Sequence, residues 1–144
     1  FAISTSRVQI RTVLMQQNQF DLPELARFIA GNLPWVSHWA LMQLERFGYA
    51  RLQWENKFVD SSTDFAIIGN AINICDSLGL PVKLFNFPFC SVPKSFRNLT
   101  NKSISDWKQK YLDICKTCSK KNDCCGVFEW YHSDIGFAGL GPIA

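Results

Sequence analysis

Four cysteines in the second half of the chain have the type and spacing of ligands for a metal centre. Cys115, Cys118 and Cys124 form a C-x2-C-x5-C run, in which the first two can direct both sulfurs at one centre from a single turn. A closed site needs a fourth ligand, and Cys90 is the best candidate because it follows a predicted strand. Thiolates bind both zinc and iron–sulfur clusters, so either centre is consistent with this set.

The other two cysteines have weaker claims as ligands. Cys125 is adjacent to Cys124, and neighbouring residues rarely ligate one centre together, so one of the two is expected to serve and an exchange of their roles stays open. Cys75 lies on the apolar stripe of a predicted helix, where a small buried hydrophobe is expected. His38 and His132 have no ligand spacing and are expected to be structural or exposed.

Three kinds of site compete for this cysteine set. Zinc sites with four thiolates usually show two C-x2-C pairs, and this chain has one. The six cysteines are an even number and would allow disulfides, but no secretion signal is visible. An iron–sulfur cluster is the favoured interpretation, with a zinc-stabilised module that recognises an acidic partner as the alternative.

Strands alternate with helices in the part of the chain that precedes these cysteines. The strands are predicted at Val8–Met15, His38–Leu44 and Val82–Phe87, and the helices at 21–31 and Asp64–Leu78. Asp21 and Glu24 resemble a capping box at the start of the first helix, and Gly31 and Pro34 are expected to end it. This alternation predicts βαβ units and a parallel sheet, hence an α/β fold.

Three strands are too few to close a barrel, so we expect a preceding half to supply further strands, or an edge to pair with a second copy. The segment 48–59 is irregular, and the sequence does not decide between a loop and a short hairpin. A short helix is expected from Ser103 to Ile114, with Trp107 and Tyr111 on one side of it. The Gly-rich end, Ser133–Ala144, is expected to be a loosely held tail.

Positive charge is concentrated around the cysteines. The segment Ser91–Lys121 carries a net charge of +6, and the rest of the chain −3. This pattern is consistent with a solvated basic face, or with compensation for an anionic cluster or an acidic peptide. No nucleic-acid reader motif is present, and no apolar run is long enough to span a bilayer. We therefore expect a cytoplasmic protein that binds neither nucleic acid nor membrane.

Several segments together resemble one known family. These segments are IRTVLMQQN, LPELARFIAGNLPWVSHWALMQLERFGYARLQW, LFNFPFCSVP and SISDWKQKYLDICKTCSKKNDCCGVFEWY. In this order they are similar to the C-terminal portion of the His-Xaa-Ser system radical-SAM maturases, and the similarity covers nearly the whole chain.

The resemblance implies the C-terminal half of a partial (β/α) TIM-type barrel over residues 1–88. A Cys-rich segment at 89–131 would bind an auxiliary four-iron four-sulfur (4Fe–4S) cluster, and 132–144 would be a tail. The full enzyme would bind S-adenosylmethionine and a second 4Fe–4S cluster. Its substrate would be a small ribosomal peptide with His-Xaa-Ser repeats, and a partner maturase is expected.

The resemblance also suggests which residues would hold S-adenosylmethionine or the peptide. In a barrel of this kind the cofactor lies at the carboxyl ends of the strands, where this chain carries the amides of Gln16, Gln43 and Asn86. Glu45 follows the second strand and is expected to pair with Arg46 or Arg51, unless it contacts a ligand.

Two features depart from the family pattern. No C-x3-C-x2-C motif, which would hold the cluster that cleaves S-adenosylmethionine, occurs in this chain. We therefore expect that cluster in a missing N-terminal half, and we expect the chain alone to be inactive. Cys125 stands where the family tends toward glycine.

Overall fold

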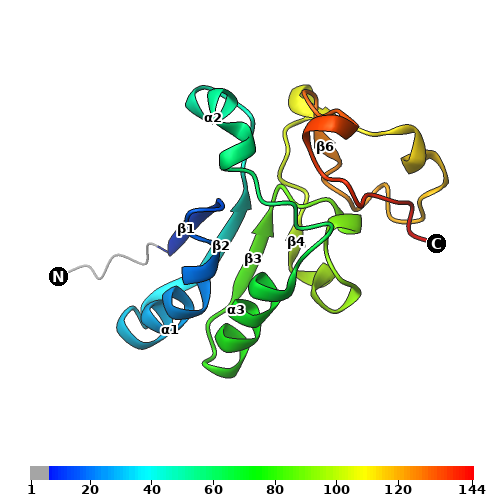
Figure 1. Cartoon of the computed structure of the whole chain (residues 1–144). Helices are drawn as coiled ribbons and strands as arrows, with labels where there is room; N and C mark the ends of the chain where they lie inside the picture. The colour runs from blue at the N-terminus through cyan, green and yellow to red at the C-terminus, as the bar shows by residue number, and fades with distance from the viewer. Residues whose placement is uncertain (1–6) are drawn as a thin grey trace.

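A computed structural model describes residues 7–144 as a mixed α/β fold with a four-stranded parallel sheet (Figure 1). The strands are β1 (Val8–Leu14), β2 (Val36–Gln43), β3 (Val82–Phe85) and β4 (Thr100–Asn101). They lie side by side in chain order, β1-β2-β3-β4. The α/β class and the parallel sheet are therefore confirmed. Within residues 7–144, no helix has both the length and the apolar character needed to cross a membrane.

Two helices cover one face of the sheet (Figure 1). They are α1 (Leu22–Asn32) and α3 (Ala66–Ser77). Trp39 and Leu41 of β2 and Leu84 of β3 are almost fully buried in the core that these helices share with the sheet. Each such side chain contributes roughly 1.5–3 kcal/mol by leaving water, which makes this layer the rigid base of the molecule.

The opposite face of the sheet has no helical layer in the part of the chain that the structure describes. Arg11 and Val13 of β1 and Lys83 of β3 are exposed on it. Arg11 lies over the ring of Phe85, 5.9 Å from its centroid. This face of the sheet therefore exposes both charged and apolar side chains.

Three sequence predictions about local structure are wrong, and one undecided segment is resolved. Asp21 makes no side-chain capping hydrogen bond, and Gly31 lies within α1 and does not end it. The segment Ser103–Ile114 is not a helix: it forms a 3-10 turn and then β5 (Gln109–Lys110), which pairs antiparallel with β6 (Val127–Phe128). The undecided segment 48–59 forms α2 (Tyr49–Leu52) and a 3-10 turn.

The C-terminal tail is held against the rest of the molecule, contrary to the prediction. The side chain of Phe137 is buried, and the hydroxyl of Tyr131 donates to its carbonyl at 2.7 Å. The backbone N–H of Ala138 donates to Asp60 Oδ2, and that of Gly139 to Ser62 Oγ, both at 2.8 Å. The tail therefore belongs to the packed structure.

Candidate metal centre

The four predicted cysteines line one hollow. Cys90, Cys115, Cys118 and Cys124 all contribute to its wall. Most of the remaining wall is apolar and includes Leu112, Ile114, Val127, Leu140 and Ile143. The part of the Cys-rich segment that follows β4, residues 102–131, lies beyond the carboxyl ends of strands β1 to β4 (Figure 1). Sulfur donors from three parts of the chain therefore share one largely apolar space.

Short turns carry these cysteines into the hollow. Cys90 lies in a 3-10 turn, Phe89–Ser91, that follows β3. Cys115 lies in a second 3-10 turn, Asp113–Thr117, and Cys118 follows at its end. Cys124 is placed by the turn into β6, where Gly126 has a φ of +67°. Glycine adopts this left-handed conformation without the cost that a Cβ imposes.

Backbone N–H groups are directed at two of the sulfurs. Cys124 Sγ accepts from the N–H of Phe89 and of Gly126, both at 3.3 Å. Cys118 Sγ accepts from the N–H of Ile143 at 3.4 Å. Such donors stabilise negative charge on sulfur and are the outer-shell interactions that tune metal-bound thiolates.

Burial opposes negative charge on the thiols of Cys90 and Cys115, whereas hydrogen bonds lower the pKa of Cys124. The pKa of Cys124 is lowered to about 6, first by a hydrogen bond from the Cys125 thiol and then by the two backbone N–H groups, while burial opposes the shift. The pKa of Cys90 is raised, first by burial and also by charge on Cys124 and Cys115. Burial likewise raises the pKa of Cys115. A cation between these sulfurs would stabilise their thiolate forms, against both the cost of burying charge and the repulsion between thiolates.

The arrangement does not match a closed site for one ion. Within residues 7–144, no group of three or more His, Cys, Asp or Glu side chains is arranged to hold a single metal ion. Tetrahedral zinc, with Zn–S bonds of ~2.3 Å, requires its sulfurs only about 3.8 Å apart. In an iron–sulfur cluster each thiolate binds a different iron, with the inorganic core between the thiolates. Which of the two centres the four thiols would hold stays a prediction.

The remaining cysteines and the two histidines lie outside the hollow's wall. Cys125 is 1% exposed, and its thiol donates to the carbonyl of Gly126 at 3.4 Å. Cys75 is fully buried in the core on α3. His38 lies on β2 beside Ser37, and His132 is exposed. All six cysteines are free thiols.

The three amides predicted to bind a cofactor contact the chain itself. Gln16 donates to the carbonyls of Glu55 and Phe58, each at 2.9 Å. Gln43 is 3% exposed and donates to Val59 O at 2.6 Å, whereas its Oε1 has no partner among the described residues. These bonds hold the loop between β2 and α3, and a cofactor role for Gln16 and Gln43 stays a prediction.

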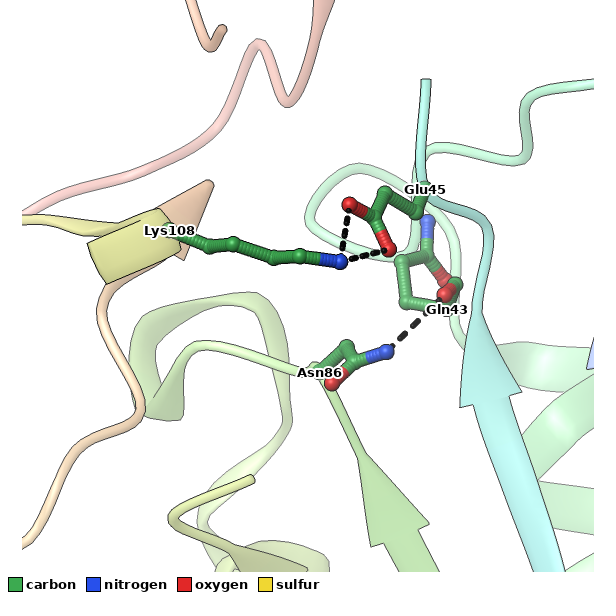
Figure 2. Close-up of polar contacts among 4 residues, drawn as sticks. All are labelled: Gln43, Glu45, Asn86 and Lys108. Carbon is green, nitrogen blue, oxygen red and sulfur yellow. Dashed lines mark hydrogen bonds and ion pairs between the residues drawn. The ribbon is translucent and has the colours of Figure 1, made fainter. Parts of the chain in front are cut away.

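Asn86 joins the ends of neighbouring strands (Figure 2). Its Nδ2 lies 3.5 Å from the backbone carbonyl of Gln43, and its Oδ1 accepts from the hydroxyl of Ser103 at 3.0 Å. Its φ of +64° lies in the left-handed region, which a residue with a side chain rarely adopts. The structure thus brings Asn86 and Gln43 together, with Gln16 bound to the loop that Gln43 also contacts.

Glu45 pairs with Lys108 and not with the arginines predicted from the sequence (Figure 2). Lys108 Nζ lies 2.9 and 3.2 Å from the two carboxylate oxygens. The Lys108 and Glu45 side chains are only 29% and 31% exposed. The pair therefore links the end of β2 to the Cys-rich segment.

Glu45→Gln should lower the free energy of unfolding by about 1 kcal/mol, because it removes one charge of a partly buried pair. Glu24→Gln is the control, since Glu24 pairs with Arg27 on α1 but is 80% exposed, and it should change stability by less than about 0.5 kcal/mol. Urea denaturation of both variants measures the difference. Equal losses in the two variants would show that the Glu45–Lys108 pair has no linking role.

Part of the basic segment is already engaged within the chain. Lys108 pairs with Glu45, and Lys116 pairs with Asp113. Lys110 donates to the carbonyl of Tyr131, and Arg97 to that of Val92. Lys121 lines the hollow. Of these contacts, only the pair with Glu45 offsets a charge within the net +6, because that sum already includes Asp113.

Sequence reasoning missed the N–H donors and the contribution of residues 140–143 to the wall of the hollow. No sequence signal indicates them, because backbone groups carry no residue type and the tail comes from outside the cysteine run. Comparisons with protein-family models, curated proteins and solved structures found no match to this chain. The candidate centre therefore rests on its residues and their geometry: four thiols, directed N–H donors and an apolar wall.

Proposed function

We propose that this chain is the C-terminal part of a radical-SAM peptide maturase and binds an auxiliary 4Fe–4S cluster through Cys90, Cys115, Cys118 and Cys124. The observation that carries the proposal is the convergence of these four thiols on one hollow. The directed N–H donors and the apolar wall support it, since both are common around iron–sulfur sites.

The arrangement of the sheet supports the proposal that it is part of the wall of a barrel. Parallel strands in sequential order, with helices α1 and α3 on one face, are the arrangement of a (β/α) barrel. A doubly wound sheet would instead reverse its strand order and carry helices on both faces. The open face, with Arg11 and Lys83, would then line the inside of a barrel completed by other strands.

The chain's own residues would perform three tasks around the cluster. Cys90, Cys115, Cys118 and Cys124 supply a thiolate for each of four irons, so ligation would be complete. The N–H groups of Phe89, Gly126 and Ile143 stabilise charge on the sulfurs, and the apolar wall limits water. When bound, such a cluster supplies one-electron chemistry.

The family resemblance supports the remaining parts of the proposal. A further segment with C-x3-C-x2-C would hold the second 4Fe–4S cluster and S-adenosylmethionine. The substrate would be a small ribosomal peptide with His-Xaa-Ser repeats, modified in the cytoplasm, with a partner maturase. On this proposal the chain alone is inactive.

Metal and sulfide analysis of anaerobically purified protein tests the cluster. We expect brown protein with about four irons and four sulfides per chain, as a 4Fe–4S cluster contains. Colourless protein with one zinc per chain would instead support the zinc-stabilised module. The coding region upstream of Phe1 tests the enzyme assignment, because it should encode C-x3-C-x2-C, and its absence there would contradict the maturase proposal.

A further inference from the structure

Residues 138–143 run from an anchor, which they form with the loop before α3, to the cysteine hollow. The anchor consists of the bonds from Ala138 N–H to Asp60 and from Gly139 N–H to Ser62. Contact at Gly139 is so close that a Cβ there would lie 2.7 Å from the carbonyl oxygen of Ser62. The chain direction is therefore set before it reaches the hollow.

Beyond this anchor, residues 140–143 form part of the hollow's wall. The N–H of Ile143 donates to Cys118 Sγ at 3.4 Å, and its carbonyl accepts from Ser119 N–H at 2.9 Å. Gly141 lies in the same wall of the hollow as Cys90. The segment thus contacts Cys118 directly and shares the wall of the hollow with the other three candidate ligands.

These contacts have two physical consequences for a bound cluster. An N–H donor stabilises negative charge on sulfur, and a reduced cluster carries one more negative charge than its oxidised form, so each donor raises the reduction potential. The side chains of Leu140 and Ile143 add apolar cover that keeps water and oxidants from the cluster.

We propose that residues 140–143 are a strap that closes the hollow and tunes the cluster through the N–H group of Ile143. The inference rests on the proposed cluster and assigns to the tail a role in positioning and protecting it. Ile143 is a positioning residue, since it acts through Cys118.

Ile143→Pro tests the tuning, because proline has no N–H to donate. The midpoint potential of the anaerobic, cluster-loaded protein should shift to more negative values. Ile143→Val is the matched control, since it keeps the N–H, and its potential should equal that of the unchanged protein. Equal potentials in all three proteins would overturn the tuning role.

Deletion of residues 140–144 tests the closure. The deletion should speed the loss of iron to a chelator several-fold, as well as the bleaching of the cluster in air. In metal-free, reduced protein it should also speed the alkylation of Cys90 and Cys118 several-fold, while Cys75 in the core stays unreactive. Unchanged alkylation would overturn the strap even if no cluster binds. Absence of iron from the unchanged protein would instead overturn the proposed function.

Discussion

Cys118→Ala should remove most of the iron and sulfide from anaerobically purified protein, because an alanine would leave one iron without its thiolate in a site that requires four. We expect the loss to be roughly fivefold or more per chain. Cys118 follows the short turn that carries Cys115, and its sulfur accepts the Ile143 N–H at 3.4 Å. Iron and sulfide content and the visible absorption spectrum measure the effect.

Cys75→Ala is the matched control for this loss. Cys75 is a free cysteine like Cys118, but its side chain is fully buried in the core, on α3. Its replacement leaves a small cavity and should cost about 1–2 kcal/mol of stability, with iron and sulfide unchanged. If both variants lost iron equally, or if Cys118→Ala kept its cluster, the assignment of the ligands would be wrong.

Gly126→Ala should have the second large effect, because the glycine sits at the turn that directs Cys124 into the hollow. Its φ is +67°, and a Cβ there would lie 2.7 Å from the carbonyl oxygen of Lys110. The left-handed conformation costs a residue with a side chain roughly 1–2 kcal/mol, and overpacking adds ~1–3 kcal/mol. The β5–β6 pairing and the Gly126 N–H bond to Cys124 would both be disturbed.

We therefore expect Gly126→Ala to lower the free energy of unfolding by about 2–4 kcal/mol and to reduce iron content several-fold. Gly79→Ala separates the cost of the left-handed conformation from the cost of overpacking. Gly79 has a φ of +74°, and a Cβ there would meet no other atom within 4 Å. This control should cost only ~1–2 kcal/mol and keep its iron. Denaturation and iron assays measure both variants, and equal iron content in the two would contradict the role of this turn.

Elements with a strong local pattern were predictable from the sequence. The apolar periodicity of α1 and α3, and the β-branched and apolar residues of β1, β2 and β3, indicate the α/β class without any contact information. The bounds differ by a few residues, because caps and turns depend on hydrogen bonds such as the one that Asp21 does not make.

Elements that depend on distant partners were not predictable. Trp107, Tyr111 and Ile114 have helical spacing, but Gln109 and Lys110 pair with β6, and Trp107 remains 74% exposed. The two-residue strand β4 exists only because β3 lies beside it. In each case a tertiary contact overrides the local preference.

The same distinction applies to the cysteine site, where local spacing was predictable and contacts with distant residues were not. The spacing of Cys115, Cys118 and Cys124 is visible in the sequence, and the position of Cys90 after a strand indicates the carboxyl edge of the sheet. The tail was predicted to be loose because its glycines carry no apolar pattern. Its attachment depends on Asp60 and Ser62, which lie 78 and 77 residues away along the chain.

Iron-edge X-ray absorption of the anaerobically purified protein tests the central claim most directly. If the four cysteines hold a cluster, the spectrum should show iron bound only by sulfur, with a neighbouring iron shell that Cys118→Ala removes. Iron with nitrogen or oxygen neighbours and no second iron, or a metal signal from zinc alone, would contradict it.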